Sequence, residues 1–128
     1  MTKLFCKQYF GFLDQKEMSQ LPKGFNLEEF KTILRDEIES NGGLILNYEM
    51  SALGQIPGRG HFGLAVALAT ANINDRKQTF LLLLDPWPET PIAWVPTDLM
   101  FNAINTTDKA TGKHRGFLIR TGHLRDNN

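Results

Sequence analysis

Cysteine is nearly absent from this sequence, which has one in 128 residues. A single thiol cannot close an internal disulfide, so a disulfide-built scaffold is excluded and a reducing compartment is favoured. Charge of one sign is not in excess either: 14 basic and 14 acidic side chains give a formal net charge of zero. The apolar run of residues 80–84 is far shorter than the roughly 20 residues that span a membrane. We therefore expect one cytoplasmic domain over residues 1–128, with neither nucleic acid nor membrane as a partner.

Signatures of resident cofactors are also missing. The three histidines and the cysteine do not have the spacing of a metal site, so no metal ion and no cofactor are predicted. The glycine-rich stretch 54–60 is not a phosphate-binding loop, because no Gly-Lys-Ser/Thr follows it. A small basic cluster is interpreted as a solvated turn; its members are Lys109, Lys113, His114 and Arg115.

Two stretches have helical patterns. Asn26 and Glu29 have the spacing of a capping box, and the glycines at 42 and 43 stop the helix that this box begins. Its apolar positions recur at helical intervals: Leu27, Phe30, Ile33, Leu34 and Ile38. A second helix is predicted from Thr97 or Asp98, with Leu99, Met100, Ala103 and Ile104 as its apolar positions.

The remaining patterns predict strands. Buried-type runs lie at 44–48 and 80–84, and a last strand is predicted at 116–119. Residues 61–71 alternate loosely and are rich in small residues, which predicts a strand whose backbone is closely approached by its neighbours. The polar residues 72–77 indicate a hairpin between this strand and 80–84. Residues 1–25 are interpreted as an irregular or short-strand entry, and the prolines at 86, 88 and 91 exclude regular pairing there. Short turns between strands favour an antiparallel sheet with helices on one side, an α+β fold.

His61 is the first candidate for chemistry. It follows a glycine turn, which allows close approach of backbone and ligand. A hairpin brings its two open ends together, so Asp85 is expected near the start of the His61 strand, where a carboxylate would fix the imidazole tautomer. The alternatives stay open: a half-buried histidine bonded to a carbonyl, and an aspartate that turns the chain before Pro86.

Cys6 is the one possible nucleophile. A reactive cysteine usually lies at a helix N-terminus or beside a cation, where the thiolate is stabilised. Cys6 instead lies in an aromatic, strand-like segment with Lys7 beside it. The sequence favours an inert buried thiol and keeps a nucleophile as the alternative.

Several short motifs in one order resemble the phytochelatin synthase family over residues 46–120. They are Asn47-Tyr48, Ala52-Leu53-Gly54-Gln55, Gly60-His61-Phe62, the apolar run into Asp85, Trp94-Val95-Pro96, Thr111-Gly112-Lys113 and Arg115-Gly116-Phe117. Members of this family are glutathione γ-glutamylcysteinyltransferases with a papain-like fold. In them a cysteine attacks the amide before the glycine of glutathione, glycine leaves, and a second glutathione, often as a cadmium or zinc thiolate, accepts the acyl group; some relatives hydrolyse the intermediate instead.

The resemblance implies roles for four residues. His61 would be the general base and Asp85 the residue that orients it, while Gln55 and Gly60 would contact the substrate. The family's nucleophile precedes its histidine by more residues than the 60 found here. We therefore expect the histidine- and aspartate-bearing half of the catalytic domain, without the nucleophile-bearing half.

Three hypotheses follow from this expectation. The chain is an enzyme that uses Cys6 or the thiol of a partner chain, a non-catalytic remnant of the same fold, or an interaction module. Because half of a two-lobed fold leaves apolar surface uncovered, we also expect self-association or a partner chain.

Overall fold

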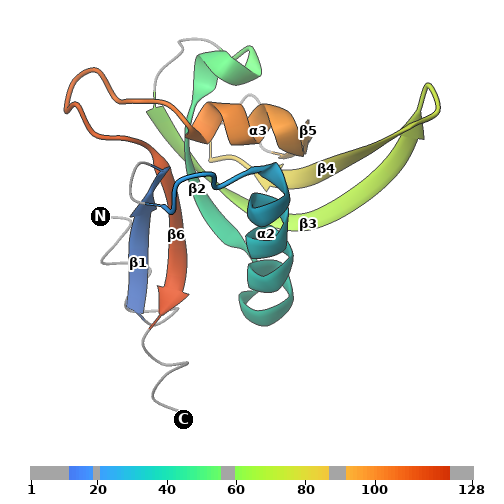
Figure 1. Ribbon diagram of the computed structural model, residues 1–128, viewed down its shortest axis with the longest axis horizontal. Helices are drawn as coiled ribbons and strands as arrows, with labels where there is room; N and C mark the ends of the chain where they lie inside the picture. The colour runs from blue at the N-terminus through green and yellow to red at the C-terminus, as the bar shows by residue number, and fades with distance from the viewer. Residues whose placement is uncertain (1–11, 19–20, 56–59, 87–91, 122–128) are drawn as a thin grey trace.

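The computed structural model describes residues 12–18, 21–55, 60–86 and 92–121. Within them, two α-helices lie against one face of a six-stranded antiparallel sheet (Figure 1). The elements, in chain order, are β1 (Phe12–Glu17), α2 (Leu27–Asn41), β2 (Leu44–Glu49), the 3-10 helix η2 (Met50–Leu53), β3 (Gly60–Ile73), β4 (Arg76–Leu84), β5 (Ile92–Pro96), α3 (Thr97–Ile104) and β6 (Gly116–Thr121). The α+β prediction is confirmed.

Both predicted helices form where the sequence places them. The Asn26 side chain accepts a hydrogen bond from the Glu29 amide at 3.0 Å, and Glu29 accepts from the Asn26 amide at 3.1 Å, so the capping box is complete. Gly42 ends α2 in the left-handed conformation, with φ of 84°. α3 begins at Thr97, directly after the strand β5.

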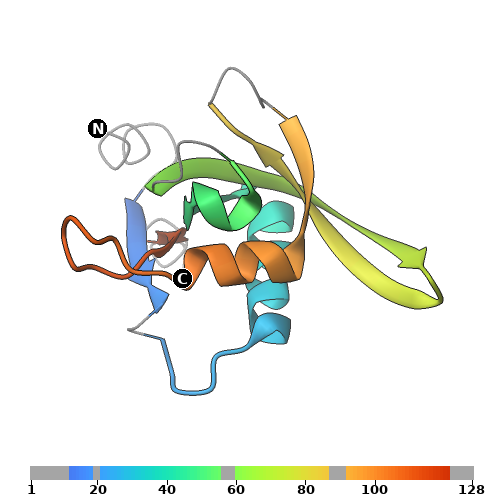
Figure 2. The same cartoon turned by 90° about the horizontal axis from the view of Figure 1, so that it is seen from above.

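The order of strands in the sheet is β1-β6-β2-β3-β4-β5. β3 and β4 form a long hairpin whose turn residues, Asn74 and Asp75, both have positive φ, as a two-residue hairpin turn requires. Figure 2 shows this hairpin extending beyond the helices, and residues 69–77 at its tip are exposed. The hairpin is longer than predicted because its strands continue through Asn72, Ile73 and the polar residues 76–79.

The sequence did not predict β5, and it gave β1 only as the short-strand alternative for residues 1–25. Among the described strands β1 pairs with β6 alone, from the opposite end of the chain, and short periodicity inside residues 1–25 does not reveal such a partner. β5 begins at Ile92 and ends on Pro96, and it lies at the edge of the sheet. Proline is tolerated on an edge strand because its missing N–H is not needed by a further neighbour.

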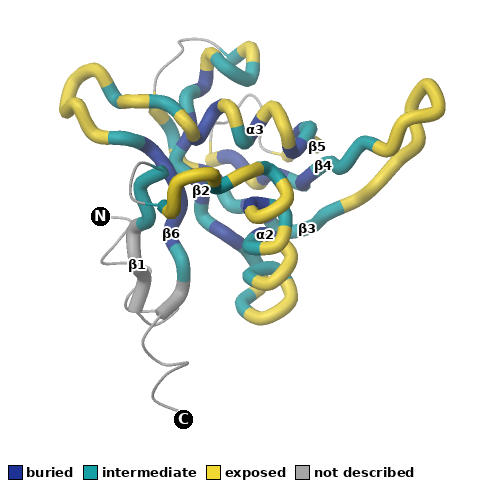
Figure 3. The backbone as a smooth tube through the Cα atoms, viewed as in Figure 1, coloured by how far each residue is buried: buried dark blue, intermediate teal, exposed yellow. Residues whose placement is uncertain are grey.

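The core lies between the sheet and the helices (Figure 3). Its fully buried side chains come from α2, α3 and the helix-facing positions of the strands: Phe30, Leu34, Leu44, Leu46, Tyr48, Leu81, Leu83, Met100, Ala103, Ile104 and Phe117. Leu99, predicted for the apolar side of α3, is instead 37% exposed. Tyr48 is the largest fully buried side chain, and it leads from the core to the candidate site.

Candidate active site

His61 and Asp85 meet at the open end of the β3–β4 hairpin. His61 is the second residue of β3, and Asp85 directly follows the last residue of β4. The distance between His61 Nε2 and Asp85 Oδ1 is 2.5 Å. The predicted contact between these residues is therefore present in the structure, while their catalytic roles stay predictions.

The contact determines which nitrogen of the neutral imidazole ring carries the proton. Asp85 has a side chain that is only 2% exposed, and its carboxylate accepts the Nε2–H of His61. In a neutral imidazole one nitrogen carries the proton and the other accepts, so this bond places the basic lone pair on Nδ1. Holding one tautomer in this way is what the orienting carboxylate does in a catalytic triad.

The second oxygen of Asp85 is held by two further side chains. Tyr48 Oη donates to Asp85 Oδ2 at 3.2 Å, and Gln55 Nε2 donates to the same oxygen at 3.0 Å. Each oxygen of the buried carboxylate thus has a donor, which offsets the cost of removing the charge from water. The carboxylate cannot rotate without losing one of these bonds, and its Oδ1 stays directed at His61.

Tyr48 serves as a donor because it stays protonated. Burial raises the pKa of the Tyr48 phenol well above its ordinary value, and the neighbouring Asp85 charge raises it further. Tyr48 lies opposite His61 in the β2–β3 register, and its ring packs edge-on against the imidazole with centroids 5.8 Å apart. In the sequence Tyr48 is part of the motif Asn47-Tyr48 but has no predicted role, because a buried tyrosine in a strand looks like core.

Gly63 makes room for this arrangement. A Cβ at Gly63 would lie 2.9 Å from Leu83 Cδ1 and 3.2 Å from Tyr48 Oη. The prediction of a strand whose backbone is closely approached by its neighbours is confirmed at this position.

Gln55 and Gly60, predicted to contact substrate, take part in contacts within the protein. Gln55 binds Asp85, as described above. Gly60 lies against the Nε–Nη2 edge of the Arg115 guanidinium, since a Cβ at Gly60 would be 3.0 Å from both nitrogens. Their contact with substrate stays a prediction.

Arg115 corrects the interpretation of residues 109–115 as a solvated turn. Its side chain is 5% exposed, and it donates from Nη1 to Thr106 Oγ1 at 3.0 Å. Its Nη2 lies 3.4 Å from Glu49 Oε1 and 3.9 Å from Asp108 Oδ1. The interpretation fails because Arg115 also pairs with Glu49 of β2, a remote residue that a local charge pattern does not show.

Asp108 lies in the loop that leads to Arg115 and accepts hydrogen bonds from within it. Its carboxylate accepts from the Ala110 amide at 3.1 Å and from Thr111 Oγ1 at 2.9 Å. The hydrogen bond from the Ala110 amide is the largest cause that lowers the pKa of Asp108 below its ordinary value.

Cys6, the candidate nucleophile, lies outside the described residues, so its distance from His61 is not part of this geometry. No group of three or more potential metal ligands occurs among the described residues. In the same part of the chain, no helix is long and apolar enough to cross a membrane.

The family model described as phytochelatin synthase matches residues 6–117, most of the sequence and all of the site. The chain belongs to the phytochelatin synthase family. Among curated proteins, it is 36% identical over 76 residues to glutathione gamma-glutamylcysteinyltransferase 3 of Lotus japonicus and 37% identical over 76 residues to glutathione gamma-glutamylcysteinyltransferase 1 of Triticum aestivum. Each match covers 59% of this chain but only 15% and 14% of the relative.

The fold also occurs among solved structures. The crystal structure of SERA5E from Plasmodium falciparum superposes with a TM-score of 0.54 at 11% identity, over 84% of this chain and 46% of that one. At this identity the likeness concerns the fold alone. It shows that the arrangement of sheet and helices occurs as part of a larger chain.

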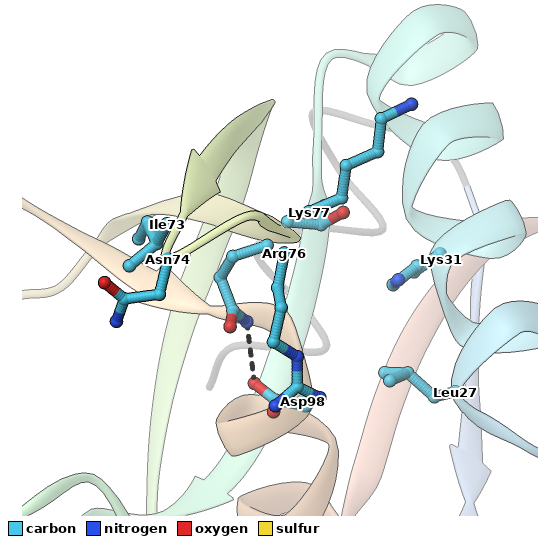
Figure 4. Close-up of a pocket in the computed structure, with 9 residues that line it drawn as sticks. Leu27, Lys31, Ile73, Asn74, Arg76, Lys77 and Asp98 are labelled. Atoms are coloured by element: carbon cyan, nitrogen blue, oxygen red, sulfur yellow. Dashed lines mark hydrogen bonds between the residues drawn. The ribbon is translucent and has the colours of Figure 1, made fainter.

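A separate groove of about 510 Å³ lies between the hairpin tip and the first turns of α2 and α3 (Figure 4). Lys31, Arg76 and Lys77 line it together with Asp98, which accepts a hydrogen bond from Gln78 Nε2 at 3.2 Å. None of its lining residues belongs to the His61–Asp85 site. The groove therefore does not bear on the chemistry of the pair.

Proposed function

We propose that this chain supplies the general base of a thiol-dependent acyl transfer from glutathione. The observation that carries the proposal is the short contact between His61 Nε2 and Asp85 Oδ1, with Tyr48 and Gln55 holding the other carboxylate oxygen. Membership of the phytochelatin synthase family supports glutathione as the substrate. The larger assembly would be a papain-like fold, of which this chain is the histidine- and aspartate-bearing lobe.

In the proposed reaction, His61 Nδ1 takes the proton of a cysteine thiol. The thiolate attacks the carbonyl carbon that links the cysteinyl residue of glutathione to glycine, and the imidazolium returns the proton to the departing glycine nitrogen. The product is a γ-glutamylcysteinyl thioester. Water, or the free amino group of a second glutathione that is present as such or as a metal thiolate, then takes the acyl group and releases the protein thiol.

The thiol is the part that the described residues do not supply, since they contain no cysteine. We propose that a partner chain provides it and that the isolated chain releases no glycine from glutathione. Cys6 as the nucleophile is the competing possibility. It requires a sulfur within hydrogen-bond reach of His61 Nδ1, or joined to it through one water.

The test measures glycine released from glutathione by the purified chain, by Cys6→Ala and by His61→Ala. No release from any of the three, with all of them folded, agrees with a thiol supplied by a partner. Release that disappears in Cys6→Ala identifies Cys6 as the nucleophile and refutes the partner-thiol proposal.

Binding is measured in parallel, because it does not depend on the thiol. Glutathione added to isotopically labelled protein should shift the NMR signals of His61 and its neighbours. γ-Glutamylcysteine, which lacks the scissile amide and the glycine, is the matched control and should shift them less. If glutathione causes neither glycine release nor a shift of these signals, the proposed substrate is refuted.

A second function, self-association, is supported by an apolar face on the side of the sheet away from the helices. In the strand registers Leu64 lies opposite Leu84, and Leu84 lies opposite Ile92, so these side chains share one face. Ile92 is 64% exposed, and Trp94, two residues along the same edge strand, is 52% exposed. We propose that this face binds a second copy of the chain, since adjoining exposed apolar side chains commonly mark interfaces.

A further inference from the structure

Arg115 is a buried cation that contacts two neighbours of the candidate site: Gly60, which precedes His61, and Glu49, which follows Tyr48. Its backbone is fixed from two directions: its amide donates to the Thr106 carbonyl at 2.9 Å, and its carbonyl accepts from the Met18 amide at 2.9 Å. The guanidinium therefore extends from a well-anchored position. A buried charge needs such partners, because an uncompensated one destabilises a protein strongly.

The Nε–Nη2 edge of the guanidinium lies against Gly60, the residue before His61. The absence of a side chain at Gly60 allows the contact, since a Cβ would lie 3.0 Å from Nε and Nη2. Gly60 is also opposite Glu49 in the β2–β3 register, one step from the Tyr48–His61 pair. The position of the guanidinium thus fixes the first residue of the strand that carries His61.

A second contact of the Arg115 guanidinium, with Glu49, connects it to Asp85. Arg115 Nη2 faces Glu49 Oε1 at 3.4 Å, while Glu49 Oε2 accepts from Ser51 Oγ at 2.9 Å at the start of η2. The amide of Gln55 donates to the Met50 carbonyl at 3.0 Å, which ties Gln55 to the same short helix. Gln55 in turn donates to Asp85 Oδ2.

We propose that Arg115 is a positioning residue that holds His61 through Gly60 and Asp85 through Glu49, η2 and Gln55. The inference rests on the proposed role of His61 as the base. Arginine suits this position because its planar fork serves Thr106 and Glu49 at once while its Nε–Nη2 edge lies against Gly60, which the single ammonium of lysine cannot do.

The test uses the ring-nitrogen NMR signals of His61 in the full chain, assigned by their loss in His61→Asn. These signals report which nitrogen carries the proton, and the measurement needs no turnover. Arg115→Lys keeps the charge but not the fork, and Gly60→Ala pushes a methyl group against the guanidinium. Both should move the two nitrogen signals of His61 toward each other, as the preference for Nε2–H weakens.

Asp108→Asn is the matched control. It removes the 3.9 Å ion pair with Arg115 without touching Gly60 or Glu49, and it should leave the His61 signals unchanged. If Arg115→Lys does not fold, Gly60→Ala and Glu49→Gln decide the question. His61 signals that stay unchanged in the folded variants, even when the melting temperature falls, would reduce Arg115 to a structural residue and overturn the proposal.

Failure of the proposed function gives a different result. If His61 signals respond as expected but glutathione neither binds nor releases glycine, the positioning role stands and the substrate assignment falls. If glutathione is turned over with the partner present, the same variants should lower kcat by up to about 100-fold with little change in KM, because a small misplacement of a base acts mainly on the chemical step.

Discussion

Replacing Tyr48 by phenylalanine tests the described site through stability. The change removes one hydroxyl, and Asp85 Oδ2 keeps its bond from Gln55. Hydrogen bonds to charged groups contribute about 1.5–3 kcal/mol. Since the Tyr48–Asp85 bond is long, at 3.2 Å, and a second donor remains, we expect the lower value, about 1.5 kcal/mol at pH 7.

The expected difference depends on pH because the pKa of Tyr48 is raised in the folded protein. A raised folded-state pKa contributes stability that is present below the unfolded value of about 10 and is lost as pH rises towards the folded value. Through ionisation of Tyr48, each pH unit above 10 lowers the free energy of unfolding of the parent by about 1.4 kcal/mol, and the phenylalanine variant has no such loss. The difference between them should therefore fall from about 1.5 kcal/mol at pH 7 to nearly zero at pH 11.

The assay is urea unfolding of both proteins at pH 7, 9, 10 and 11, monitored by tryptophan fluorescence. Titration of other groups is common to the two proteins and cancels in the difference. A difference that stays constant from pH 7 to pH 11 would mean that Tyr48 ionises alike in the folded and unfolded states, and the reasoning about its burial would be refuted.

Asp85→Asn provides the background for a double-mutant cycle. It removes the charge of Asp85, the second cause of the raised Tyr48 pKa, and leaves burial, the larger cause. The pH dependence of the Tyr48→Phe difference should persist in this background, while its value at pH 7 becomes smaller because the acceptor is no longer charged.

Two further predictions concern packing at the site and on the opposite face of the sheet. Gly63→Ala should lower the free energy of unfolding by about 1–3 kcal/mol, because the added methyl group meets Leu83 and Tyr48 inside a packed core; urea unfolding measures this, and a change below about 0.5 kcal/mol would show that the core has room to adjust. Ile92→Lys should convert a self-associated chain to a monomer in sedimentation velocity, whereas Leu99→Lys, a matched change at an exposed leucine of α3, should not. A parent chain that sediments as a monomer at high concentration would contradict self-association.

The sequence by itself determined the features that depend on neighbours along the chain. The capping box at Asn26 and the glycine stop at 42 are local hydrogen-bonding and conformational effects, so their residues are sufficient to predict them. The contact of His61 with Asp85 was also predictable, because the hairpin between them is a local structure whose two ends must meet. The family motifs around these residues pointed to the same pair.

Only the tertiary structure decided which residues hold that pair. Tyr48 lies 37 residues from Asp85 in the sequence, and Arg115 contacts Glu49 and Gly60 from the position just before β6. Polar residues whose partners are remote look solvent-exposed in a sequence, so Arg115 was interpreted as part of a solvated turn. The pairing of β1 with β6 escaped prediction for the same physical reason: it joins backbone groups across a long sequence separation, and no local pattern records the partner. The edge strand β5 pairs with the neighbouring β4 and was missed for another reason, because the prolines just before it indicated irregular chain.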